Sequence, residues 1–235
     1  MRRPALYISL LAIFLTGCSG GSGGNSSNST VPPAPTNLQS AQAPSLPIYV
    51  AGITLKATDS AGSKWSATYS NVAAGTSSFN QQIAYANSVQ FAVSKESTVV
   101  DSESVTEFAL MNPYSPLGLA FGFSTLPGRL TVLSTTSYVP LPATLKVGDS
   151  GPLISGSANS CCSFSQTYSV SASTPTELLL NIDRTFTDFG IDHGEASLTG
   201  LYSGSSVMTY SVKADGAATL VGIRVTINGT TLSFQ

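Results

Sequence analysis

The sequence predicts an all-β body, built either as an antiparallel β-sandwich or as a meander closed into a barrel. Hydrophobic and polar residues alternate with period 2 through most of the chain after residue 47, for example at Trp65, Ala67 and Tyr69. Short stretches rich in Gly, Pro, Asn and Asp separate these runs. Residues 48–235 contain no amphipathic helical pattern, and residues that favour helices are sparse. Together these observations indicate many short strands joined by turns.

The first predicted strands lie between residues 48 and 110. The run 48–57 changes phase near Gly52, which indicates a β-bulge. The stretch Asp59-Ser60-Ala61-Gly62 that follows it has the composition of a turn. Further strand-like runs cover residues 64–70, 79–85, 89–93 and 98–110.

The second half of the chain ends in the clearest strand pattern. Before it, strand-like runs cover residues 117–124, 130–139, 168–172 and 178–186, and Pro140 and Pro142 exclude a central strand where they stand. The hairpin dipeptides Asp215-Gly216 and Asn228-Gly229 join the runs 207–213, 219–227 and 231–234. We therefore predict a C-terminal three-stranded meander, with one face made by Val221, Ile223, Val225 and Ile227.

Composition divides the chain into segments. Residues 18–46 are rich in Gly, Ser and Pro and cannot bury enough apolar surface to fold, so we predict a disordered N-terminal tether there. Prolines cluster near residues 111–114, which indicates an N-terminal β unit over 47–112 and a C-terminal β unit over 113–235. One continuous β domain over residues 47–235 is the alternative.

The first 17 residues have the pattern of a removable signal. Arg2 and Arg3 precede an apolar run, and the small residues Thr16 and Gly17 stand before Cys18. The apolar run of about 10 residues is shorter than the roughly 20 residues that a membrane-spanning helix needs. The stretch Leu15-Thr16-Gly17-Cys18 resembles the lipobox of bacterial lipoproteins.

This resemblance implies both an anchor and a location. Residues 1–17 would be a signal peptide that is cut off before Cys18, and Cys18 would then carry a diacylglyceryl group and an N-linked acyl chain such as palmitate. Two or more acyl chains hold a protein stably on a membrane. In this family an Asp after the cysteine often retains the protein in the inner membrane, and Ser19 stands there instead. The resemblance thus implies the outer membrane, with the body in the periplasm or at the cell exterior.

Composition also argues against some partners. Charged residues make up 9% of the chain, and the formal net charge is −2. A typical soluble domain has about 25% charged residues. The sequence contains no basic cluster, so we expect no nucleic acid partner. No motif identifies a protein partner or a small ligand.

Cys161 and Cys162 are the only cysteines beyond the lipobox. Adjacent cysteines can pair only as a strained vicinal disulfide, or each can bond another chain, and the extracytoplasmic compartment is oxidising. A vicinal disulfide that acts as a switch and two small residues without a role are both compatible with the sequence. The second interpretation is favoured, because no flanking cation would activate a thiol here.

The stretch Gly148-Asp149-Ser150-Gly151-Pro152 resembles the nucleophile loop of chymotrypsin-like serine proteases and the Gly-Asp-Ser block of a lipase family. Those proteases need His, Asp and Ser in that chain order, whereas the single histidine, His193, follows Ser150. The lipases place an Asp three residues before the histidine, where this chain has Gly190, and they are α/β proteins. We therefore predict a turn and no catalytic residue, with a serine hydrolase using Ser150 and His193 as the alternative.

Asp188, Asp192, His193 and Glu195 are weak candidates for a metal site, because carboxylates and imidazole bind calcium and transition metals. Together with the nearby Asp183 they match no ligand-spacing motif. The sequence favours a solvated acidic turn, and it predicts neither a metal nor a cofactor apart from the covalent lipid on Cys18.

For two further groups of residues, the sequence indicates whether their side chains face solvent, the core or a ligand. An acidic run is predicted to face solvent and to protect a strand edge from mispairing: Glu96, Asp101, Glu103 and Glu107. Four aromatic residues fit a ligand groove or, more often, a core: Trp65, Tyr69, Tyr85 and Phe91.

The sequence thus predicts a lipid-anchored, extracytoplasmic, β-rich module with a structural or binding role and without a catalytic set. Its contact with the membrane would be the lipid on Cys18. The alternatives are the serine hydrolase described above and a β-barrel carrier that holds an apolar ligand.

Overall fold

The computed structural model describes residues 36–79, 82–109, 121–126, 129–158, 162–188, 204–227 and 229–235. All regular structure in these residues is β-strand. The strands, in chain order, are β1 (Ser40–Gln42), β2 (Val50–Thr58), β3 (Lys64–Phe79), β4 (Gln82–Lys95), β5 (Thr98–Ala109), β6 (Phe121–Leu126), β7 (Arg129–Tyr138), β8 (Thr144–Lys146), β9 (Ser150–Ala158), β10 (Cys162–Ala172), β11 (Glu177–Asp188), β12 (Gly204–Lys213), β13 (Ala218–Ile227) and β14 (Thr230–Phe234).

Twelve of these strands form one antiparallel sheet in which neighbours follow chain order. Only β8 interrupts the sequence, between β7 and β9, and it pairs with β1 in a separate two-stranded sheet. The prediction of an all-β antiparallel fold is therefore confirmed. The C-terminal meander is confirmed as well, because β12 pairs with β13 and β13 with β14.

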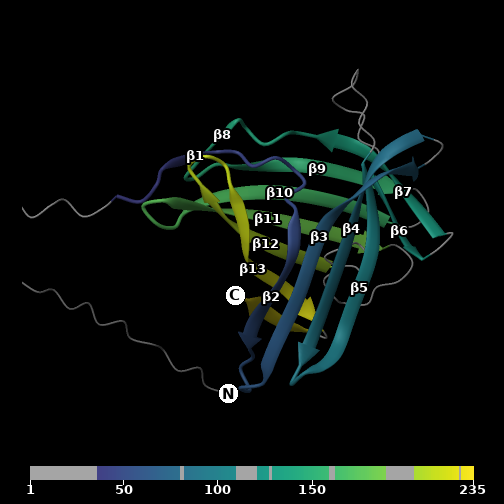
Figure 1. Ribbon diagram of the computed structural model, residues 1–235, viewed down its shortest axis with the longest axis horizontal. Helices are drawn as coiled ribbons and strands as arrows, with labels where there is room; N and C mark the ends of the chain where they lie inside the picture. The colour runs from purple at the N-terminus through teal and green to yellow at the C-terminus, as the bar shows by residue number, and fades with distance from the viewer. Residues whose placement is uncertain are drawn as a thin grey trace, which may run out of the picture. The chain divides into compact units, whose positions relative to one another are not determined.

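The long sheet folds over into two layers. In Figure 1, strands β3–β5 pass in front of strands β9–β12, and the two sets of strands cross at a steep angle, as in orthogonally packed sheets. Strands β6 and β7 join the layers on one side. On the other side β2 meets the end of the chain: the Lys56 N–H donates to the Gln235 carbonyl (3.0 Å) and the Gln235 N–H donates to the Lys56 carbonyl (2.9 Å).

The core lies between the two layers and is made by every second residue of each strand, as the pleat requires. The layer of β2–β5 contributes Ala67, Tyr69 and Phe91, among others. The opposite layer contributes aliphatic side chains such as those of Leu178 and Leu180, which are fully buried. Because both layers contribute to one continuous cluster, neither can bury its apolar face without the other.

Bulges decide which residues of a strand face the core. The predicted bulge near Gly52 is confirmed, because the register of β2 and β3 shifts between Val50 and Ile53. A second bulge, which the sequence analysis missed, places Thr209 opposite Gly222 and Tyr210 opposite Leu220. The extra residue, Val221, faces outward with 36% exposure, whereas Leu220 is buried. The predicted face of β13 is therefore wrong at Val221, since a bulge reverses the alternation.

Strand β9 also differs from the prediction. Residues 148–152 were expected to form a turn, but β9 begins at Ser150 and includes Pro152. The pairing of β9 with β10 is irregular between Gln166 and Thr167, next to the Thr167–Pro152 pair. An irregular position tolerates proline, because the ladder hydrogen bond that proline cannot donate is already interrupted there.

Residues 38–43, here called the strap, belong to the folded body although the sequence analysis assigned them to the tether. Within the strap, β1 pairs with β8. The N–H groups of Leu38 and Gln42 donate to the carbonyls of Thr174 (2.9 Å) and Ala214 (3.0 Å), which lie in two hairpin turns at the same end of the second layer. Alternation explains the difference, since Ala41 faces the core with 3% exposure. The three-residue strand β1 thus attaches the N-terminal part of the described chain to the body.

The described residues from 36 to 235 belong to one compact unit. The predicted division between residues 112 and 113 lies outside the described residues. Strand β5 precedes this gap and β6 follows it, and the two strands pair with each other. Within the described part of the chain, no helix could span a membrane.

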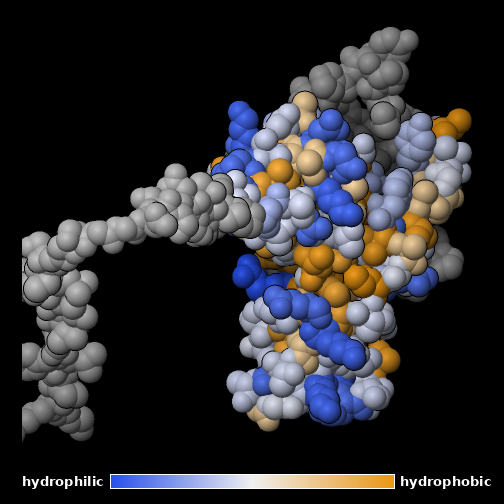
Figure 2. Space-filling model, turned by 60° about the vertical axis from the view of Figure 1, so that its left-hand side comes forward, coloured by the Kyte–Doolittle hydropathy of each residue, from blue (hydrophilic) through white to orange (hydrophobic). Residues whose placement is uncertain are grey.

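Hydrophobic residues also reach the surface. Figure 2 shows one face, on which hydrophobic residues gather across the middle between more hydrophilic regions. Among the residues whose side chains the structure describes, the most exposed large apolar one is Ile83 (80%), followed by Val99 (61%), Tyr85 (55%) and Tyr49 (54%).

Candidate functional site

Strand β5 carries acidic side chains into the interior. Its residues alternate so that Glu103 (3% exposed), Val105 and Glu107 (7% exposed) face the opposite layer. The predicted solvent-facing position of Glu103 and Glu107 is therefore wrong. The physical reason is that alternation places residues 101, 103, 105 and 107 on one face, and the opposite layer covers that face.

Glu107 pairs with Arg184 of β11, so an ion pair links the two layers. Both terminal nitrogens of the Arg184 guanidinium donate to Glu107 Oε1 at 3.2 Å. With its amide oxygen facing the guanidinium, Gln166 accepts from Arg184 Nε and from a terminal nitrogen, each at 3.0 Å. The guanidinium also lies over the Phe164 ring, 5.3 Å from the ring centre. The side chains are only 15% (Arg184) and 9% (Glu107) exposed.

Two buried tyrosines lie in the electrostatic field of this ion pair. Burial is the main cause that raises the pKa of Tyr69 well above its usual value, and electrostatic interactions with Tyr210 and Glu107 add to the shift. Burial likewise raises the pKa of Tyr210, although Arg184 opposes the shift. Both phenols therefore stay protonated at neutral pH, which makes them hydrogen-bond donors and poor nucleophiles. Because the ion pair is enclosed and hydrogen-bonded within the body, we assign it to the contact between the two layers and not to ligand binding.

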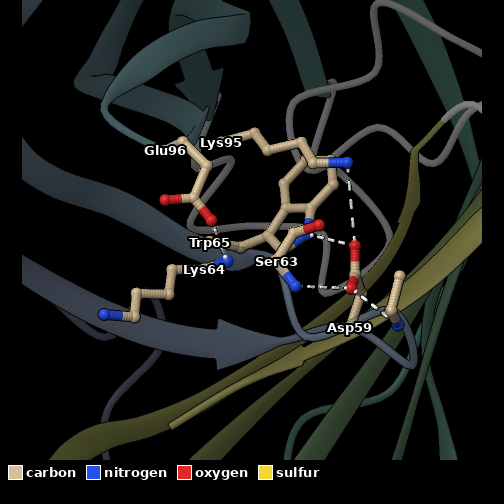
Figure 3. A network of polar contacts seen from close by, with 7 residues as sticks. Asp59, Ser63, Lys64, Trp65, Lys95 and Glu96 are labelled. Atoms are coloured by element: carbon tan, nitrogen blue, oxygen red, sulfur yellow. Dashed lines mark hydrogen bonds and ion pairs between the residues drawn. The ribbon is translucent and has the colours of Figure 1, made fainter.

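A second polar network lies at the turn between β2 and β3 (Figure 3). Asp59 Oδ1 accepts from the N–H groups of Ala61 and Ser63, both at 2.9 Å. Asp59 Oδ2 accepts from Trp65 Nε1 at 3.0 Å and lies 3.8 Å from Lys95 Nζ. The Lys95 ammonium stands over the Trp65 ring, 5.0 Å from its centre. The network ties the turn before β3 to the end of β4.

Asp59 should make stability depend on acid pH. The hydrogen bond from Trp65, and then that from the Ser63 backbone, lowers the pKa of Asp59 from its ordinary value of 3.8 to about 2. A carboxyl with a depressed folded-state pKa stabilises the fold above its unfolded pKa and loses that contribution as pH falls through the folded pKa. We expect the stability advantage of the natural protein over Asp59→Asn to be constant above about pH 4 and to shrink toward pH 2. Urea unfolding of both proteins across pH 2–7 measures it, and a pH-independent difference would contradict the assignment.

Two hollows lie on the outer faces of the layers. Hollow A, of about 880 Å³, lies on the face of β2–β5. Its outward side chains are neutral and mostly short, and paired residues form rows across the strands, such as Thr68, Ala92 and Ser102. The side chains of Tyr69, Phe91 and Glu103 point to the core, so these residues offer only their backbone to hollow A.

Hollow B, of about 510 Å³, lies on the face of β10–β14. In contrast to hollow A it holds one acidic and one basic side chain, Asp183 and Arg224. It also holds a hydrogen-bonded pair, in which Thr209 Oγ1 donates to Asn181 Oδ1 at 2.8 Å. Gly222 lies among these residues and has no side chain to fill the space. This set was not predicted from the sequence, although a glycine inside a strand pattern is a signal of close approach or of a bulge.

The sequence-predicted sites are only partly described. Cys18, Asp192, His193 and Glu195 lie outside the described residues, and Asp188 is described only as the last residue of β11, opposite Cys162. Within the part of the chain that the structure describes, no three His, Cys, Asp or Glu side chains are grouped to hold a metal ion.

The Gly-Asp-Ser stretch forms a turn that leads into a strand. Gly148 has φ of +93°, a conformation that glycine adopts without strain. Asp149 Oδ2 accepts from the Lys146 N–H at 2.8 Å, so this carboxylate closes the turn. Ser150 is exposed at the start of β9. Its predicted alternative partner, His193, lies outside the described residues, so the hydrolase alternative stays a prediction.

Cys162 is almost fully buried and is disulfide-bonded. The two other cysteines of the chain, Cys18 and Cys161, lie outside the described residues, so the vicinal pairing with Cys161 stays a prediction. The aromatic group is divided by the fold: Tyr69 and Phe91 belong to the core, Trp65 is half-buried in the Asp59 network, and Tyr85 is exposed. These four residues therefore do not form one groove.

Comparisons with protein-family models, with curated proteins and with solved structures found no match for this chain.

Proposed function

We propose that this protein is a lipid-anchored binding module of the bacterial cell envelope, held by acyl chains on Cys18 and facing the periplasm or the cell exterior. The observation that carries this proposal is the stretch Leu15-Thr16-Gly17-Cys18 at the end of a short apolar run behind two arginines. The Gly-, Ser- and Pro-rich residues that follow suit a spacer between a membrane and a folded domain.

The folded body supports a binding role more than the two alternatives. A carrier of an apolar ligand needs an enclosed apolar cavity, whereas hollows A and B open on outer faces and mix polar and apolar lining residues. A serine hydrolase needs a carboxylate that orients its base, and Asp149 instead bonds the backbone of its own turn. If a purified sample showed esterase or peptidase activity that Ser150→Ala abolished, the hydrolase would replace the binding module as the proposed function.

The anchor is tested by metabolic labelling of the full chain in a bacterial host. We expect the natural chain to incorporate radiolabelled palmitate and to partition into the membrane fraction, and Cys18→Ser to lose both properties, because only a thiol accepts the diacylglyceryl group. Ser19→Ala is the matched control and should keep the label. A natural chain that takes up no label and stays soluble without detergent would reject the anchor.

A further inference from the structure

We propose that hollow B binds a short peptide with free termini, whose ammonium group pairs with Asp183 and whose carboxylate pairs with Arg224. The inference rests on the proposed binding role and names its ligand class. It does not depend on lipid, so the anchor and the site can fail separately.

The register of three strands defines the site. One row across β11, β12 and β13 contains Asn181, Thr209 and Gly222. The next row on the same outer face contains Asp183, Val207 and Arg224. Neighbouring strands are about 4.8 Å apart, so the Cα atoms of Asp183 and Arg224 are about 10 Å apart. An extended dipeptide spans about 7 Å, which leaves room for both side chains to reach its ends.

The two charges have no ionic partner within the described part of the chain. The ion pairs Lys95–Asp59 and Arg184–Glu107 lie elsewhere, and neither involves hollow B. Val207 separates Asp183 from Arg224 in their row. Opposite charges on one face that do not pair with each other match a ligand that carries both an ammonium and a carboxylate, and a ligand with one charge would satisfy only one of them.

Gly222 creates the depth of the site. A Cβ atom added there would lie 3.4 Å from the Phe234 carbonyl and 3.5 Å from Thr209 Cβ, which are ordinary contacts, so packing does not require glycine. The adjacent bulge turns the apolar side chain of Val221 outward, next to the space that Gly222 leaves in hollow B. Leu179 and Val221 can contact an aliphatic side chain of the peptide, since both line hollow B. The bond to Thr209 fixes the Asn181 amide, whose nitrogen remains a donor for a peptide carbonyl.

The test uses the full chain in detergent and the dipeptide Ala-Leu, followed by backbone amide NMR shifts. N-acetyl-Ala-Leu lacks the ammonium and Ala-Leu-amide lacks the carboxylate. We expect Ala-Leu to shift the amides of β11–β13 and to bind about fivefold more tightly than either derivative, as half-exposed charge pairs allow. Asp183→Asn should remove the preference over N-acetyl-Ala-Leu, and Arg224→Met the preference over Ala-Leu-amide.

Two further variants locate the site. Gly222→Val should abolish the shifts while the remaining amide spectrum stays that of the folded chain, and Lys146→Met, which removes an exposed cation elsewhere, should change nothing. Equal affinity for the three probes, absence of shifts with millimolar Ala-Leu, or binding that survives Gly222→Val would each overturn the inference. Peptide binding by a chain that takes up no palmitate would reject the anchor alone.

Discussion

Replacing Arg184 by Met is expected to lower the free energy of unfolding by about 3–5 kcal/mol, because it leaves the Glu107 carboxylate buried without its cation. The two side chains are 15% and 9% exposed, so water replaces little of the lost interaction. The substitution also removes the hydrogen bonds that the guanidinium donates to Gln166 and its contact with the Phe164 ring. Guanidinium denaturation of the natural protein and the variant gives the difference directly.

Two companion variants separate the ion pair from general damage to the sheet. Arg224→Met makes the same substitution at an exposed position of β13 and should change stability by no more than about 0.5 kcal/mol. The double variant Glu107→Leu with Arg184→Met removes both charges and should recover most of the loss, since apolar residues can replace a buried pair at little cost. An Arg184→Met protein as stable as the Arg224→Met protein would show that the layers do not depend on this contact.

Replacing Gly216 by Ala is expected to loosen the strap and to destabilise the body by about 1–3 kcal/mol more than the same change at Gly229. Both glycines sit in hairpin turns with positive φ, +86° and +74°, so both variants carry a similar backbone strain. Only at Gly216 would the new Cβ meet other atoms, 3.3 Å from the carbonyl oxygens of Gln42 and Ala43. At Gly229 the corresponding space is open.

Hydrogen exchange distinguishes a local from a global effect. The N–H groups of Leu38, Gln42 and Ala43 are bonded to carbonyls outside the strap and should exchange slowly in the natural protein. In Gly216→Ala these amides should exchange faster than in Gly229→Ala, while β11 and β12 stay protected in both. Equal exchange of the strap in the two variants would mean that the strap adapts to the added methyl group. Under the proposed anchor, the strap is where the tether joins the body, so this contact sets how firmly the body is attached.

Local features of the sequence determined much of this fold. Period 2 in segments such as Trp65–Tyr69 reports only the pleat of the chain itself, and the hairpin glycines Gly216 and Gly229 report only the sign of φ in a turn, so neither needs a partner. The C-terminal meander and the bulge at Gly52 followed from such signals. The lipobox is likewise a contiguous stretch, and for that reason it yields a hypothesis about location without any structure.

Tertiary structure decided which face of each strand is inside and which residues meet. Alternation placed Glu103 and Glu107 on one face, but only the second layer buries that face and brings Arg184 to it across 77 residues of chain. The bulge at Val221 turned this one residue of the predicted β13 face outward, because pairing with β12, and not the sequence of β13 alone, sets the register. Hollow B combines Asp183 of β11 with Gly222 and Arg224 of β13. Such a site depends on strand order and register, which are properties of the assembled sheet.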